Sequence, residues 1–259
     1  MRLLLAGTAK TGNVWIENIL ARIYELRILE PPNVPSTSEA DFEEFCNAER
    51  FADDSIFHQH FVPTERFFEI VEKVNCRVLT AIRNPYDIFV SLYFYIQNFR
   101  ADFVKAADPG AVLIDRPIDD PIVLEFLKYT FDEFLRSACR WVGGGKSIIV
   151  RYEDLHADPF AAISRITNLI QPRAEQRIRD AIAESSADVL RKQDPVFARH
   201  IRKGTVGDWR NHLTEQHLAI FREWHRDAIE YLGYAVIEEQ QPRASGHCAS
   251  ASIGGTLVA

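Results

Sequence analysis

The chain has 259 residues and 47% of them are hydrophobic, so it is long and apolar enough to bury a substantial core. Its formal net charge of −7 argues against nucleic acid as a partner, because a polyanion needs a locally basic surface. No stretch approaches the ~20 apolar residues of a membrane span, and the apolar run before Lys10 is too short for a signal peptide.

The cysteines favour a reducing, cytoplasmic setting. Cys46, Cys76, Cys139 and Cys248 lie far apart and form no C-x-x-C pair. This spacing indicates neither a zinc site nor a disulfide framework.

Short apolar runs predict strands that alternate with helices. The runs lie at residues 3–6, 55–60, 77–82 and 147–150. Apolar residues at helical spacing, together with the helix starts Asn84-Pro85 and Asp158-Pro159, predict helices at 15–23, 67–74, 85–99, 123–142, from 159, 173–190 and 214–232. The expected fold is α/β with three layers, in which a central parallel sheet of about four or five strands is flanked by helices.

The remaining segments are predicted loops and a tail. Residues 108–121 are rich in proline and aspartate, and residues 191–213 are polar and basic, so both are expected to be loops. From about Glu238 large apolar residues are scarce, which is typical of a disordered segment. We therefore expect one domain over 1–237 and a disordered tail over 238–259.

Polar and aromatic side chains follow each predicted strand. Lys10 lies in the loop of residues 7–13 after the first strand, His60 and Arg83 follow the next two, and Arg151-Tyr152 follows the fourth. Ligands bind beyond the carboxyl ends of the strands in open parallel sheets, so these side chains are expected to converge on one edge.

The loop of residues 7–13 has the features of an anion site, since it is bordered by glycine and opens onto a helix whose free N–H groups point outwards. It is not a Walker A motif, because Lys10 precedes Gly12 and no hydroxyl follows a Gly-Lys pair. An ordinary strand-to-helix turn is the alternative interpretation.

A second basic cluster lies in ARHIRKGTVGDWR at residues 198–210. Its cations are Arg199, Arg202, Lys203 and Arg210. A solvated charge run is the simpler interpretation, but Trp209 in a polar, glycine-containing loop favours a ligand site.

Four sequence motifs of the chain together resemble motifs of the cytosolic sulfotransferases, which use 3′-phosphoadenosine 5′-phosphosulfate (PAPS). AKTGNVW at 9–15 is similar to the PKSGTTW of that family, and RNPYDIFVSLYFY at 83–95 is similar to RNxKDxxVSxYxF. RYEDLHADP at 151–159 resembles YEDLxxDP, and RKGTVGDWRNHLT at 202–214 resembles RKGxxGDWKNxFT. The order and approximate spacing also agree, so the resemblance implies a P-loop nucleotide-kinase-like fold.

The resemblance implies that PAPS is the co-substrate, leaves as adenosine 3′,5′-bisphosphate and needs no metal. Residues expected to hold the 5′-phosphosulfate are Lys10, Thr11, Gly12 and Asn13, followed by Val14 where the family has threonine. Residues expected at the 3′-phosphate are Arg83 and Ser91 on one side and Arg202, Lys203 and Gly204 on the other. Residues expected at the adenosine are Trp15, Tyr152 and Ser185, the last in a segment similar to TSFxxM.

The expected reaction is transfer of a sulfuryl group to a hydroxyl, or an amine, of a small molecule by a monomer or homodimer. His60 is the expected general base, because it lies about as far before Arg83 as the histidine of KTHLP lies before the RN element of the family. Lys10 would stabilise the charge of the leaving phosphate. His58 is the rival base, and a purely structural role is the alternative for either histidine.

The sequence departs from the family pattern at His58, which stands where KTH has lysine, and at Ala187, which stands where an aromatic residue is expected. Two other functions therefore stay open: a P-loop kinase-like enzyme of small molecules, and an inactive nucleotide-binding descendant. The aromatic run at 89–95 is typical of a core helix or of an acceptor pocket. The acidic run at 38–45 is typical of a solvated helix face, or it lies near the acceptor entrance.

Overall fold

A five-stranded parallel sheet of order β2-β3-β1-β4-β5 forms the centre of the computed structural model, which describes residues 1–30, 38–193 and 203–239. The strands are β1 (Arg2–Ala6), β2 (Arg27–Ile28), β3 (Ser55–Gln59), β4 (Cys76–Ile82) and β5 (Ile148–Arg151). The α/β fold with a helix-flanked parallel sheet is thus confirmed, and β2 is an addition that two residues were too few to predict.

The central strand β1 shows why this sheet needs cover on both faces. Leu3, Leu4 and Leu5 are all completely buried. Successive side chains of a strand point to opposite faces. Leu3 and Leu5 accordingly pack with one core cluster, whereas Leu4 packs with a second cluster rich in phenylalanine.

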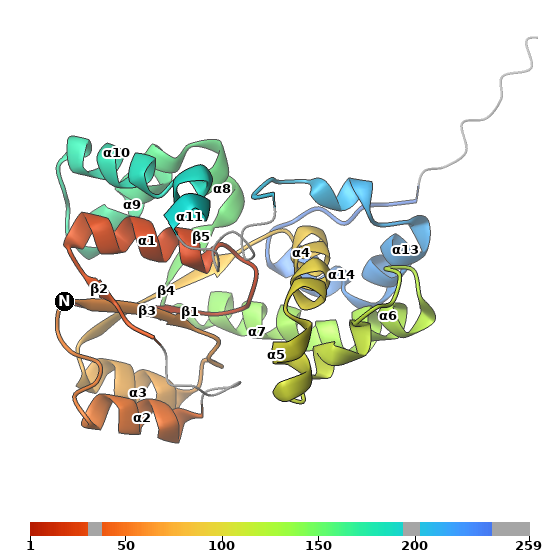
Figure 1. Cartoon of the computed structure of the whole chain (residues 1–259), viewed down its shortest axis with the longest axis horizontal. Helices are drawn as coiled ribbons and strands as arrows, with labels where there is room; N and C mark the ends of the chain where they lie inside the picture. The colour runs from red at the N-terminus through yellow and green to blue at the C-terminus, as the bar shows by residue number, and fades with distance from the viewer. Residues whose placement is uncertain (31–37, 194–202, 240–259) are drawn as a thin grey trace, which may run out of the picture.

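Different helices cover the two faces (Figure 1). Leu3 and Leu5 lie against the cluster that includes α1 (Asn13–Tyr24), α9 (Pro159–Ile170) and α10 (Glu175–Glu184). The opposite face carries α2 (Glu39–Asn47) and α3 (Glu65–Lys73). On α2, Phe42 and Phe45 are buried in the second cluster, so the acidic side chains of this helix lie around an apolar inner stripe.

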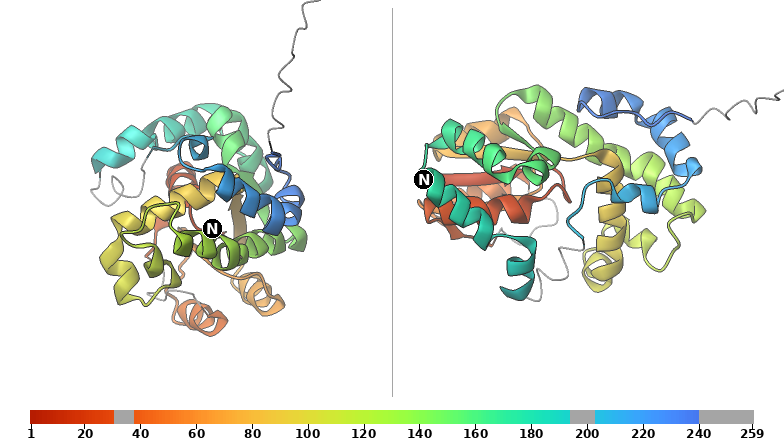
Figure 2. Two further views of the ribbon diagram at one scale, coloured as in Figure 1. Left: turned by 90° about the vertical axis from the view of Figure 1, so that its right-hand side faces the viewer. Right: turned by 90° about the horizontal axis from the view of Figure 1, so that it is seen from above.

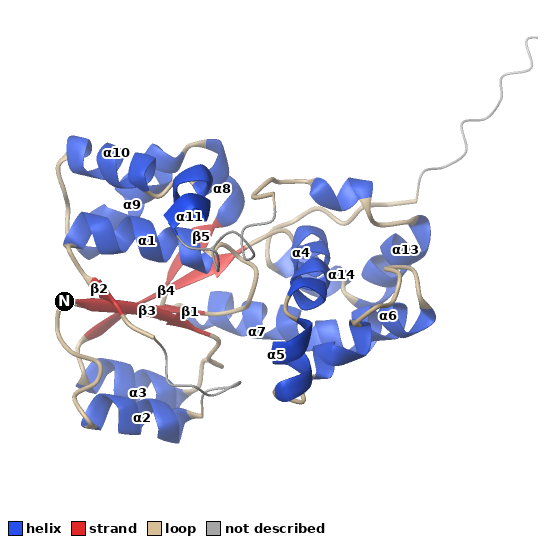
Figure 3. Ribbon diagram, in the orientation of Figure 1, coloured by secondary structure: helices blue, strands red, loops and turns tan. Residues whose placement is uncertain are grey.

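A helical region lies beyond the carboxyl ends of the strands (Figures 2 and 3). It contains α4 (Pro85–Asn98), α5 (Arg100–Lys105), α6 (Pro121–Glu125), α7 (Phe131–Gly144), α13 (Glu215–Trp224) and α14 (Arg226–Tyr231). The connecting helices α8 (Tyr152–Ala157) and α11 (Ala187–Gln193) follow β5 and α10. Short 3₁₀ turns lie at Pro109–Leu113 and Asp208–Asn211.

Several predicted helices are interrupted. The segment 123–142 is divided by a π-helical turn at Phe126–Thr130, and 214–232 is divided at His225. The segment 173–190 becomes two helices around Ser185 and Ser186. The loop predicted at 108–121 contains a 3₁₀ turn. In the segment 123–142 the buried apolar residues Val123, Leu127 and Phe131 continue across the interruption, so periodicity alone does not reveal it.

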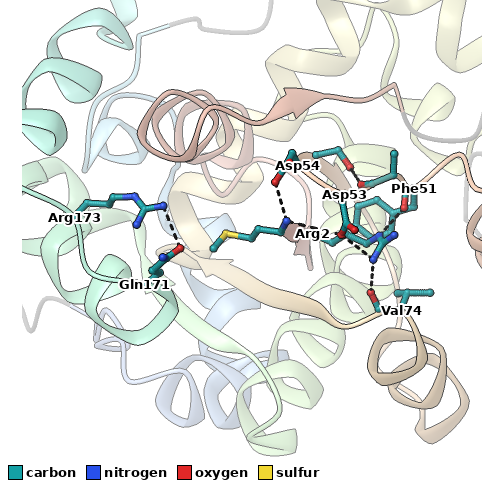
Figure 4. Close-up of polar contacts among 10 residues, drawn as sticks. Arg2, Phe51, Asp53, Asp54, Val74, Gln171 and Arg173 are labelled. Carbon is teal, nitrogen blue, oxygen red and sulfur yellow. Dashed lines mark hydrogen bonds and ion pairs between the residues drawn. The ribbon is translucent and has the colours of Figure 1, made fainter.

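At the amino-terminal ends of the strands, one arginine side chain connects β1 to neighbouring segments (Figure 4). Arg2 donates to the carbonyl oxygens of Phe51 at 2.7 Å and Val74 at 3.0 Å, and it pairs with Asp53 at 3.0 Å. These contacts join β1 to the segments that enter β3 and β4. Within the described ranges, no helix has the length and hydropathy needed to cross a bilayer.

Candidate active site

A cavity of about 350 Å³ lies at the carboxyl ends of the strands. Its walls come from the loop after β1, the first turn of α1, the end of β3, helices α4, α8 and α11, and residues 203–205. The site residues expected from the sequence that line it are Lys10, Gly12, Asn13, Val14, Trp15, His60, Arg83, Ser91, Tyr152, Lys203 and Gly204. Segments separated by almost the whole domain therefore meet in one place.

Some of the expected residues lie elsewhere. Thr11 and Ser185 are completely buried and are not part of the cavity wall. The Ser185 hydroxyl has no hydrogen-bond partner among the described residues. Arg202 lies outside the described residues. Arg151 lies at the expected edge as the last residue of β5, but its side chain does not line the cavity, because its guanidinium donates to the carbonyl oxygen of Leu232 at 2.8 Å.

Hydrogen bonds within the loop after β1 fix its conformation. The Thr11 hydroxyl donates to the carbonyl oxygen of Thr8 at 3.0 Å, and the Asn13 amide donates to the same oxygen at 3.2 Å. Lys10 has a φ of 66°, which turns the chain between β1 and α1. Thr11 thus stabilises the loop, while Lys10 and Asn13 line the cavity.

Gly12 is required by close packing at the start of α1. Its φ is 96°, and a Cβ atom there would lie 2.7 Å from Cδ2 of Tyr152. Its carbonyl oxygen accepts from the amides of Trp15 and Ile16, which begin the helix. The absence of a side chain at this position lets the Tyr152 ring pack directly against the loop.

Arg83 connects the two ends of the site. Its Nη1 donates to the carbonyl oxygen of Lys10 at 3.1 Å, and its Nη2 donates to that of Thr205 at 3.0 Å. The guanidinium also stacks on the Tyr152 ring, 4.3 Å from its centroid. Its Nε is buried without a hydrogen-bond partner among the described residues. Arg83 therefore fixes both loops and retains an unused donor.

A buried carboxylate positions the segment from Lys203 to Trp209. Asp87 on α4 accepts from the backbone N–H of Gly207 at 2.6 Å and of Trp209 at 3.0 Å. Asp208 accepts from Nζ of Lys203 at 2.8 Å. Because Asp87 is only 2% exposed, these charge-assisted bonds are shielded from water.

The histidines at the end of β3 have different partners. Nδ1 of His60 donates to the carbonyl oxygen of Gly7 at 3.0 Å, so the lone pair of this neutral ring is on Nε2. Desolvation among the surrounding protein atoms, followed by the charges of His58 and Lys10, lowers the pKa of His60 to about 4. The ring nevertheless presents surface to the cavity. His60 is thus a neutral, accessible imidazole near pH 7.

His58 differs from His60 in its partner, because its Nδ1 lies 2.9 Å from the carboxylate oxygen Oε2 of Glu17. Burial lowers the pKa of His58, but the hydrogen bond and the charge of Glu17 together outweigh that effect and raise it above its usual value. His58 also lines the cavity.

Aromatic and apolar groups form the wall nearest α1 and α8. The Trp15 and Tyr152 rings meet edge to face with centroids 6.2 Å apart, and His156 lies 6.1 Å from Tyr152. Ala187 and Leu190 of α11 also line the cavity. The Trp15 Nε1 is buried without a hydrogen-bond partner among the described residues. This wall has the apolar, flat surfaces that suit a nucleobase.

Two further wall residues are Tyr95, which the sequence predicts only as one member of an aromatic run, and His156, which the sequence-based expectations did not include. Tyr95 is four residues after Ser91 on α4, and His156 is four residues after Tyr152 on α8. Residues at this spacing share one helix face. Nζ of Lys10 lies 3.9 Å from the Tyr95 ring centroid. Of the other aromatic residues expected in a core helix or an acceptor pocket, Phe89 and Tyr93 are buried in the core and Phe94 is partly buried against it.

The fold and the site together define an α/β protein with a cavity of cationic and aromatic side chains at the carboxyl edge of its parallel sheet. The chain belongs to the sulfotransferase family, because the model of the sulfotransferase domain matches residues 1–233. Curated relatives include rat sulfotransferase 2B1, which is 24% identical over 66% of this chain and 53% of its own length. Rabbit sulfotransferase 1C2 is 22% identical over 88% of this chain and 83% of its own. The chain thus spans about half the length of the first of these relatives.

Solved structures show the same fold. Mouse sulfotransferase SULT7A1 complexed with PAP superposes with a TM-score of 0.67 and 17% identity, covering 88% of this chain and 83% of that one. Retinol dehydratase in complex with androsterone and the inactive cofactor PAP has a TM-score of 0.61 and 13% identity, with 89% and 82% covered.

Proposed function

We propose that this protein is a PAPS-dependent sulfotransferase that transfers a sulfuryl group to a hydroxyl or amine of a small molecule. The observation that carries the proposal is that one cavity contains Lys10, Arg83 and Lys203 together with a neutral imidazole, His60. Family membership and the PAP in the neighbouring structures support the same donor.

The residues of the cavity fit a nucleotide with anionic groups at both ends of its ribose. Lys10 and the N–H groups at the start of α1 would hold the 5′ end, where backbone donors and the helix dipole favour an anion. Arg83, Ser91, Lys203 and Gly204 would hold the 3′-phosphate. The unpartnered donor of Arg83 supports this assignment, since buried donors are seldom left without an acceptor.

Bound PAPS would supply an activated sulfuryl group whose leaving group is a phosphate. His60 would accept the proton of the acceptor at Nε2, because its Nδ1–H is committed to Gly7. Its lowered pKa keeps this nitrogen free of a proton near neutral pH. Lys10 would place its positive charge where negative charge develops on the leaving oxygen.

The first experiment separates this function from a kinase-like one. Calorimetry compares adenosine 3′,5′-bisphosphate with ATP·Mg, and we expect the bisphosphate to bind more tightly. Preference for ATP would favour a kinase-like enzyme.

The second experiment tests the chemistry. Transfer of labelled sulfate from PAPS is measured with a panel of phenols, sterols, aliphatic alcohols, amines and peptide metabolites. We expect His60→Ala to abolish most of the transfer, since general-base catalysis is typically worth ~10²–10⁴-fold. An absence of transfer to every acceptor, with bisphosphate binding intact, would indicate an inactive descendant.

A further inference from the structure

A buried glutamate faces the proposed site from α1. Glu17 is 4% exposed, and its Oε2 lies 2.9 Å from Nδ1 of His58 on β3. Burial of a carboxylate is strongly unfavourable unless a cation or hydrogen-bond donors compensate it. His58 supplies that compensation, so the placement of Glu17 favours an imidazolium over a neutral ring.

The surroundings of His58 place this charge at the cavity. The charged and titratable groups that face it in the described chain are Glu17 from α1, Lys10 from the loop before α1, and His60 from its own segment. His58 and His60 are two residues apart at the end of β3, and both line the cavity. Among the residues that the structure describes, His58 has a carboxylate partner, whereas His60 is bonded to a backbone carbonyl.

We propose that Glu17 holds His58 as an imidazolium, which acts as a second cation beside Lys10 and binds the anionic sulfuryl group of the donor. This inference rests on the proposed function. Glu17 is then a positioning residue, His58 contacts the transferred group, and His60 accepts the proton. The end of β3 thereby presents a charged imidazole, His58, and a neutral one, His60, and the contact with Glu17 makes His58 the charged one.

The pH dependence follows from these charges. Because Glu17 raises the pKa of His58, the imidazolium is present below that raised pKa and is lost as the pH rises through it. His60 must be neutral, and its pKa of about 4 leaves it so above roughly pH 5. Turnover should therefore fall on the alkaline side when His58 loses its proton, and Glu17→Gln should move that fall to lower pH.

The first test measures the charge of His58 directly and does not depend on enzymatic activity. Imidazole carbon-bound proton shifts of His58 are followed by NMR against pH in the wild-type protein, in Glu17→Gln and in Glu175→Gln. Glu175 is a matched control, since its side chain is 79% exposed and lies on α10. We expect the His58 midpoint to fall by at least one pH unit in Glu17→Gln alone. An unchanged midpoint would overturn the inference.

The second test asks whether the charge is what Glu17 contributes. Lysine carries its charge independently of a carboxylate near pH 8, so His58→Lys should remove the alkaline fall in turnover. At pH 8, Glu17→Gln should reduce kcat/KM for PAPS about tenfold or more in the His58 protein, but less than threefold in the His58→Lys background. Equal losses in both backgrounds would show a merely structural role.

The affinity for adenosine 3′,5′-bisphosphate distinguishes the two proposals. This product lacks the sulfuryl group, so its Kd should change less than twofold in Glu17→Gln. A wild-type protein that binds the bisphosphate and transfers sulfate, with kcat/KM insensitive to Glu17→Gln, refutes the inference and leaves the function standing. A wild-type protein that does neither refutes the function itself, while the NMR midpoints still report on the pair.

Discussion

The contact between Gly12 and Tyr152 gives a prediction whose size can be worked out. In Gly12→Ala the new Cβ would lie 2.7 Å from Cδ2 and 3.1 Å from Cε2 of a ring that is only 5% exposed. Alanine at positive φ costs about 1–2 kcal/mol. Displacement of a packed ring adds about 1–3 kcal/mol. The free energy of unfolding should therefore fall by about 2–5 kcal/mol.

Two other glycines separate these contributions. Gly145 has a φ of 63° and nothing within 4 Å of its added Cβ, so Gly145→Ala measures the cost of positive φ alone. Gly144, the last residue of α7, has the same open space without a positive φ. Gly144→Ala should be neutral or stabilising by up to about 1 kcal/mol, since alanine is the better helix former.

The assay is thermal and urea unfolding of the three variants beside the wild-type protein. For a domain of this size we expect Gly12→Ala to lower Tm by about 4–20 °C, at ~2–4 °C per kcal/mol. Affinity for adenosine 3′,5′-bisphosphate should fall with it, because the displaced ring is part of the cavity wall. If Gly12→Ala loses no more stability than Gly145→Ala, the ring moves aside freely and the argument from close packing is refuted.

Three further predictions concern the charges of the site. Asp87→Ala removes the acceptor of two backbone amides, and a hydrogen bond to a charged group is worth about 1.5–3 kcal/mol. Calorimetry should therefore show that the Kd for adenosine 3′,5′-bisphosphate rises about tenfold or more. An unchanged Kd would show that Asp87 does not position the segment from Lys203 to Trp209. Lys10→Ala should lower the turnover number for the transfer of labelled sulfate by about 100-fold or more. The control is Lys146→Ala, at an exposed position paired with Glu65, which should leave the turnover number unchanged. An effect of Lys10→Ala on KM alone would contradict the role of Lys10 in stabilising the leaving group. His60 takes up its proton near pH 6.5 in the unfolded chain but only near pH 4 in the folded chain, so the free energy of unfolding should fall as the pH drops through this window. In urea unfolding, His60→Gln should make the free energy of unfolding less dependent on pH between these values. The same pH dependence in both proteins would contradict the lowered pKa.

The sheet could be predicted because short-range patterns encode it, whereas most of the cavity wall was implied by motifs that resemble those of the sulfotransferases. The strands β1, β3, β4 and β5 are apolar runs, and the expected loops follow their carboxyl ends. The direction of a side chain at a strand end is not encoded in this way. Arg151 turns towards Leu232 although Tyr152, the next residue, lines the cavity.

The pairing of Glu17 with His58 was also beyond the sequence analysis. A glutamate inside an amphipathic helix has no pattern that distinguishes a buried carboxylate from an exposed one. The contact depends on how α1 packs across β3, which brings together residues 41 positions apart. Thr11 is a similar case, since its hydroxyl has a partner inside the loop that only the backbone conformation reveals.

The bonds from Asp87 to the amides of Gly207 and Trp209 span 120 and 122 residues of sequence. The last strand of the sheet ends at Arg151, so a chain emerging from the ribosome can assemble its strands while the segment from Lys203 to Trp209 is still unsynthesised. Contacts of such long sequence separation pay their loop-closure entropy late in folding. The part of the cavity wall formed by residues 203–205 is therefore fixed by Asp87 only after the chain has been synthesised past Trp209.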